Sequence, residues 1–103
     1  MSRRASGADN PAHDAMLQRA SGWLTVNVRA RRTQAGLTQE EFAERAGVAP
    51  TYVARVEAAT ETVNVTLRVL TAFAVALECK PHELLVPRVP PRPRPPGRPR
   101  KAA

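Results

Sequence analysis

The chain of 103 residues is long enough for one small domain, and its single cysteine, Cys79, excludes an internal disulfide. His13 and His82 stand far apart and no apolar run approaches the roughly 20 residues of a membrane-spanning helix, so we expect no metal, no other cofactor and no membrane partner. The net charge of +7 is uneven, because residues 1–85 hold ten cations and nine acids whereas residues 86–103 hold six cations and no acid.

The N-terminal region predicts an arm ahead of the main domain. Residues 1–9 are small and polar, without the apolar stretch of a secretion signal, and predict no regular structure. Asn10 can cap a short helix, Pro11 suits its first turn, and Gly22 can end it. We therefore expect an arm over residues 1–22, with one short helix.

The next signals mark two further helices. Thr25 can cap a helix that stops before Gly36. Thr38 and Glu41 have the T-x-x-E spacing of a capping box, which predicts a helix of about eight residues that ends at Gly47.

The remaining elements complete an all-α pattern. Pro50 suits the first turn of a helix over residues 50–58, and "AATETVN" predicts a loop. A longer helix over 66–77 and a short turn at "PHELL" follow, the helix with apolar residues at helical spacing: Leu67, Leu70, Phe73, Ala74 and Leu77. No strand candidate remains. We predict an all-α domain of five helices, or six, over residues 23–86.

The C-terminal segment has a different composition. Residues 87–103 contain seven prolines in seventeen positions, which excludes both helix and sheet. We therefore expect a disordered, basic, proline-rich tail.

The two helices around Gly47 carry the most specific pattern. Phe42, Val53 and Val56 fall where two steeply crossing helices must share a core, and Ala43 is small where their backbones should approach. Gly47 lies where the chain must turn through a left-handed conformation, which glycine adopts without a side-chain penalty.

This pattern is part of a longer one. The segments "VRARR", "GLTQEEFA", "AGV", "YVARVE" and an "N-V-T-L" before the last long helix occur in one order, and in that order they resemble the helix-turn-helix of the XRE family. Members of that family are phage and bacterial regulators of the Cro and repressor type. The resemblance extends from about Leu24 to Leu85 and implies a repressor-like DNA-binding domain.

The resemblance also implies two side-chain roles. Arg32 and Glu57 occupy the positions at which the family pairs an arginine of its first helix with the glutamate that ends its recognition helix. A guanidinium–carboxylate fork there would lock the two helices together; the alternative is two solvated charges. Gln39 occupies the position of an amide that clamps a DNA phosphate beside a helix N-terminus, or else it faces water.

Helix 50–58 is the expected reader of the major groove. If Val53 and Val56 point into the core, the opposite face can meet DNA through Arg55, whose fork can bind O6 and N7 of guanine together. The other candidate DNA contacts on this helix are Ala49, Pro50, Thr51 and Tyr52. The alternative is that Arg55 is only solvated and that Tyr52 packs on the domain surface.

Other features predict modest affinity from one domain. Residues 58–61 lack the basic side chains that often follow the recognition helix in this family, and Glu61 would repel phosphates. Dimerisation through residues 66–85 would double the contacts. The tail end "PPGRPRK" resembles an AT-hook, with Arg98 and Arg100 as minor-groove residues, although Pro96 replaces the first arginine of the motif. The alternatives for the tail are non-specific phosphate attraction, peptide recognition or solubility.

We therefore predict a transcription regulator of the XRE type, a cytoplasmic, nucleoid-associated homodimer that binds double-stranded DNA by sequence. No nucleophile–base pair, phosphate loop or metal cluster can be assembled, so we expect no enzyme. Three alternatives stay open: a restriction–modification controller, an antitoxin with a toxin as partner, and a module that binds another protein and does not read DNA.

Overall fold

The computed structural model describes residues 10–87, which form four α-helices and one 3₁₀-helix, with no strand in that range. The all-α prediction is confirmed. Residues 1–9 and 88–103, including Arg98 and Arg100, lie outside the described part of the chain. The elements are α1 (Pro11–Gln34), α2 (Gln39–Ala46), α3 (Pro50–Ala58), α4 (Leu67–Leu77) and η2 (Pro81–Leu84).

The first helix differs from the prediction, because α1 is one continuous helix of 24 residues. Asn10 caps it as expected, with its Oδ1 accepting a hydrogen bond from the Ala12 N–H at 2.8 Å. Gly22, however, lies inside the helix, and Thr25 is buried and donates its hydroxyl to the Val56 carbonyl at 2.7 Å. The expected helix end and second cap are therefore wrong. A glycine inside a helix costs only about 1 kcal/mol, which the packing of the flanking turns offsets.

The ends of α2 are as predicted. The Thr38 hydroxyl accepts a hydrogen bond from the Glu41 N–H at 3.0 Å, and the Glu41 carboxylate accepts one from the Thr38 N–H at 2.8 Å. Gly47 ends α2 with φ +75°, in the left-handed region. Because Pro50 starts α3 three residues later, the two short helices meet at a sharp turn.

The core lies where all four helices meet. The rings of Phe42 on α2 and Phe73 on α4 have centroids 5.1 Å apart, and Val53 and Val56 of α3 are fully buried, as predicted. Ala43 is also fully buried, so its small side chain allows α2 and α3 to approach closely. These contacts fix α3 against the rest of the domain.

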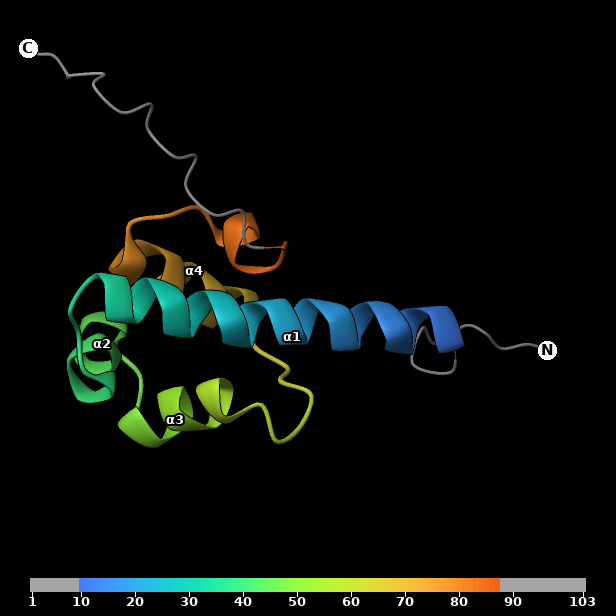
Figure 1. Ribbon diagram of the computed structural model, residues 1–103, viewed down its shortest axis with the longest axis horizontal. Coiled ribbons are helices and arrows are strands. Elements are labelled where there is room, and N and C mark those ends of the chain that lie inside the picture. Colours follow the sequence, from blue (N-terminus) through green and yellow to red (C-terminus); the bar gives the residue numbers. More distant parts are fainter. Residues whose placement is uncertain (1–9, 88–103) are drawn as a thin grey trace, which may run out of the picture.

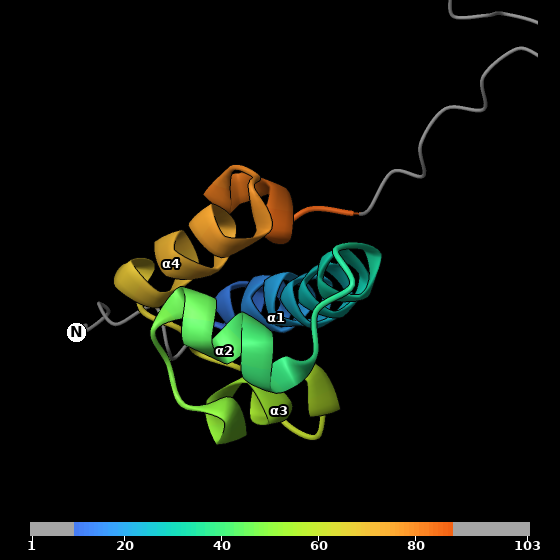
Figure 2. The same ribbon diagram turned by 90° about the vertical axis from the view of Figure 1, so that its left-hand side faces the viewer.

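The helices are arranged around α1. It runs through the domain with α3 on one side and η2 on the other, and its N-terminal turns extend beyond the other helices (Figure 1). A view along α1 shows the same order (Figure 2). Asn27 is almost fully buried and donates its amide to the Val86 carbonyl at 2.9 Å, so the described chain ends at Pro87 on the side of α1 away from α3.

Candidate nucleic-acid interface

The inner and outer faces of α3 differ sharply in chemistry. Val53 and Val56 are 0% exposed on the inner face, and the Glu57 residue next to them is 4% exposed. The outer face carries one guanidinium, from Arg55, and one hydroxyl, from Thr51; its other exposed residues are Ala49, Pro50, Ala54 and Ala58. Residues four apart lie on one side of a helix, so Thr51 and Arg55 can face the same surface together.

Tyr52 lies at the boundary of the two faces. Its side chain is half-buried, and the centroid of its ring is 6.2 Å from that of Phe73. The ring therefore packs partly against the core and ties α3 to α4, which limits how far Tyr52 can turn toward a ligand.

The C-terminal end of α3 is held by a bidentate ion pair. Arg32 Nε donates to one carboxylate oxygen of Glu57 at 2.6 Å and Nη2 to the other at 2.9 Å, while Nη1 donates to the Leu37 carbonyl at 2.7 Å. The side chains are only 13% and 3% exposed. A nearly buried, bidentate ion pair therefore joins α1 to α3.

The environment of Glu57 shifts its titration. Burial raises the pKa of this carboxyl, but the hydrogen bonds from Arg32 and Gln39 and the charge of Arg32 outweigh burial, so the pKa lies below its ordinary value of 4.5. The hydrogen bond to Glu57 correspondingly raises the pKa of Arg32. Both groups are therefore charged at neutral pH.

Gln39 takes part in the same network. It is half-buried in the first turn of α2, and its Nε2 donates to Glu57 Oε1 at 3.0 Å. The amide thus joins the start of α2 to the end of α3. The N–H groups of the first turn of α2 lie beside it, an arrangement that favours a bound anion.

Residues 10–87 carry eight cations and eight acids, so this part of the chain is electrically neutral. Glu61, in the loop after α3, is exposed, and residues 58–61 contain no cation, as the sequence shows. General attraction to a polyanion must therefore come largely from outside this region.

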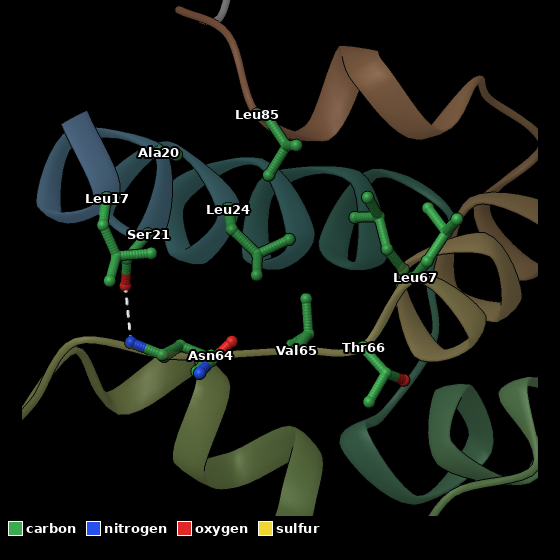
Figure 3. Close-up of a pocket in the computed structure, with 11 residues that line it drawn as sticks. Leu17, Ala20, Ser21, Leu24, Asn64, Val65, Thr66, Leu67 and Leu85 are labelled. Atoms are coloured by element: carbon green, nitrogen blue, oxygen red, sulfur yellow. Dashed lines mark hydrogen bonds between the residues drawn. The ribbon is translucent and has the colours of Figure 1, made fainter. Parts of the chain in front are cut away.

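A pocket of about 300 Å³ lies on a different part of the molecule (Figure 3). Side chains of α1, residues 63–67, Leu70 and Leu85 line it, most of them apolar, and no residue of α3 does. It is separate from the outer face of α3.

In residues 10–87, no helix is long and apolar enough to cross a membrane.

Two buried polar residues near α3 were missed in the sequence. Thr25 contacts the last turn of α3, and the Ser21 hydroxyl accepts a hydrogen bond from the Val63 N–H at 2.6 Å. Their spacing of four residues is the only signal in the sequence, and exposed polar residues of any helix show the same spacing.

A short helix pair with a sharp turn and an exposed second helix defines a helix-turn-helix DNA-binding domain. The family model described as helix-turn-helix matches residues 28–84, and the chain belongs to this family, in its XRE type, whose members are DNA-binding transcription regulators. No curated protein matches the chain.

Two solved structures are similar. A hypothetical transcription factor, NHTF from Neisseria, is 34% identical with a TM-score of 0.62, over 69% of this chain and 78% of that one. The restriction-modification controller protein C.AhdI from Aeromonas hydrophila is 36% identical with a TM-score of 0.53, over 68% of this chain and 97% of that one.

Proposed function

We propose that this chain regulates transcription by binding a specific double-stranded DNA site as a homodimer, with α3 in the major groove. The observation that carries the proposal is the division of α3, whose inner face is fully buried at Val53 and Val56 while Thr51 and Arg55 are exposed. A recognition helix needs both features, because it must be fixed to the domain and still offer donors to base edges.

Each exposed residue has a proposed role. Arg55 binds guanine through O6 and N7, and Thr51 offers a hydroxyl and a methyl to neighbouring bases. Ala49 and Pro50 are small enough to let the start of α3 approach the bases, and Tyr52 contacts bases or phosphates with the exposed part of its ring. Gln39 and the first turn of α2 bind a phosphate, which sets the position of the domain along the duplex.

Selection from a pool of genomic duplex fragments tests the proposal. We expect enrichment of one palindromic sequence, with half-sites about 34 Å apart, because a two-fold dimer presents two copies of α3. Equal binding to all fragments would refute sequence-specific recognition, and no binding to any fragment would instead favour a module that binds another protein.

The proposed dimer interface lies within residues 66–85. Leu67 and Val75, 75% and 72% exposed, lie eight residues apart on the outer face of α4 with Thr71 between them. Leu70, Phe73 and Ala74 of the same helix are buried, so the exposed pair is not needed for the core. Two such apolar faces can cover each other around a two-fold axis.

We expect Val75→Arg to raise the dimer dissociation constant by more than about tenfold, because it places an unpaired charge in an apolar contact. Sedimentation velocity at several concentrations measures the change. Val26→Arg is the matched control, since Val26 is 46% exposed on α1 and should leave the dimer intact. A dimer that survives Val75→Arg and dissociates with Val26→Arg would place the interface on α1.

The tail is proposed to add non-specific phosphate attraction, with Arg98 and Arg100 near the minor groove. Removing residues 88–103 deletes six cations and lowers the net charge from +7 to +1. If all six neutralise phosphates, the slope of log K against log salt should become less steep by about 5. Binding titrations at several salt concentrations measure this slope, and an unchanged slope would mean that the tail does not contact DNA.

A second, narrower function is favoured by the similarity to the controller C.AhdI, which covers 97% of that chain. A controller of restriction–modification genes would bind upstream of its own gene, beside genes for an endonuclease and a methyltransferase. A toxin gene in that place would instead indicate an antitoxin. Footprinting on the upstream region, together with the neighbouring genes, separates the two.

A further inference from the structure

One face of α1 presents three hydrogen-bonding side chains to α3 and to the loop that follows it. Ser21, Thr25 and Arg32 are four and seven residues apart, so they share one side of a helix with 3.6 residues per turn. Ser21 and Thr25 are 7% and 8% exposed, and both precede residues 28–84, which the family model matches. The hydroxyls of Ser21 and Thr25 form hydrogen bonds with residues outside α1.

Thr25 supplies a partner to the end of α3. Its hydroxyl donates to the Val56 carbonyl, one of the last four carbonyls of α3, which have no partner within the helix. The residues that end α2 and α4, Gly47 and Glu78, donate their backbone N–H groups to the preceding turn. No such backbone bond ends α3 within residues 10–87, and Ala59 after it has φ +59°, a costly conformation for a residue with a Cβ.

Ser21 holds the loop that leaves α3. Its Oγ accepts the hydrogen bond from the Val63 N–H at 2.6 Å, drawn as a dashed line in Figure 3. Val63 is itself only 7% exposed, so losing this acceptor would leave its nearly buried N–H without its partner. Residues 57–62 are therefore held at both ends by α1, through Thr25 at Val56 and Ser21 at Val63.

We infer that Ser21 and Thr25 are positioning residues for DNA recognition. With Arg32, they fix the last turn of α3 and the start of the following loop, and so set the depth and rotation at which α3 meets a duplex. Base contacts tolerate displacements of only about 0.5 Å and 10–20°. The inference rests on the proposed function, because it concerns how α3 is presented to DNA.

Thr25→Val tests the inference, since valine keeps the shape of threonine and removes the hydroxyl. The dissociation constant for the selected DNA site should rise roughly twofold to tenfold. The amide protons of α3 should exchange faster with solvent. Thr25→Ser keeps the hydroxyl, so its dissociation constant for DNA and its amide exchange rates in α3 should match those of the parent. Thr33→Val is the matched control on α1, because the Thr33 hydroxyl bonds only carbonyls of its own helix and is exposed.

A purely structural role must be separated from a positioning role. Leu84→Val lowers stability at a fully buried site on η2, away from α3, and should change DNA affinity less than twofold at a temperature where all variants stay folded. If Leu84→Val weakens DNA binding as much as Thr25→Val, or if Thr25→Val binds like the parent, the positioning role is refuted.

Two further variants complete the test. If Thr25→Val does not fold, Ser21→Ala replaces it; faster exchange at the Val63 amide with weaker DNA binding supports the inference, and unchanged affinity overturns it. Arg55→Ala is measured in parallel. A loss of specific binding with Arg55→Ala but not with Thr25→Val refutes only the inference, whereas no loss with either Arg55→Ala or Thr51→Ala refutes base recognition by α3 and with it the proposed function.

Discussion

Glu57→Ala is expected to destabilise the domain by roughly 3–5 kcal/mol, because it leaves the Arg32 guanidinium nearly buried without its counter-charge. A domain of this size has a total stability of only about 4–12 kcal/mol. The variant should therefore lose a large share of its stability, melt well below the parent and bind DNA more weakly. Chemical denaturation followed by circular dichroism measures the loss.

Variants at neighbouring positions show where this loss arises. Gln39→Ala removes one neutral donor to Glu57 and should cost about 0.5–1.5 kcal/mol. Glu44→Ala removes an exposed carboxylate of α2 and should change stability by less than about 0.5 kcal/mol. A Glu57→Ala variant that melts like the parent would show that the ion pair contributes nothing to stability.

The pH dependence gives a second measure of the same pair. Because the pKa of Glu57 is lowered on folding, its contribution to stability is complete above the ordinary value of 4.5 and is lost as the pH falls through the lower, folded value. Glu57→Gln cannot titrate, so its stability should fall less steeply than that of the parent below pH 4.5. Equal slopes for the two proteins would contradict the assignment.

Arg55→Ala is expected to remove most of the sequence specificity and leave the fold intact. The side chain is exposed, so its loss should change stability by less than about 0.5 kcal/mol. A bidentate contact with guanine discriminates by roughly 1–3 kcal/mol, which corresponds to about a fivefold to 150-fold loss at each half-site. Competition binding between the selected site and a site changed at that guanine measures the specificity ratio.

Three further variants separate charge from base recognition. Arg55→Lys keeps the charge without the planar fork, so it should retain non-specific affinity and lose specificity. Arg45→Ala removes an equivalent exposed charge from α2 and should leave the ratio unchanged. Thr51→Ala should lower the ratio less than Arg55→Ala, because one hydroxyl contact is lost. If the specificity ratio is unchanged in both Arg55→Ala and Thr51→Ala, base recognition by the outer face of α3 is excluded.

Local signals predicted the elements whose ends depend on adjacent residues. The capping box of Thr38 and Glu41, the left-handed Gly47 and the first-turn Pro50 place α2 and α3 within one residue of their observed ends. The inward position of Val53 and Val56 also followed from the sequence, because two short helices around a sharp turn have only one common apolar side.

The same kind of signal misled at Gly22 and Thr25. Glycine after a helical run and threonine before another are the residues that end and cap helices, and they predicted a break in what is one helix. Tertiary packing overrides such propensities, since each is worth only about 1 kcal/mol. A threonine that caps its own helix and one that contacts a distant carbonyl look alike in the sequence.

The amino-acid sequence by itself therefore determined the fold class, the family and the outward face of α3, because helical spacing, caps and turn residues act over a few positions. The family resemblance also implied the Arg32–Glu57 pair at the end of α3, and only the tertiary structure decided the other contacts that hold this end. The partners of Thr25 and Ser21 lie 31 and 42 residues further along the chain, and Gln39 meets Glu57 across 18. Hydrogen bonds over such separations depend on how the helices pack, and no local pattern encodes them.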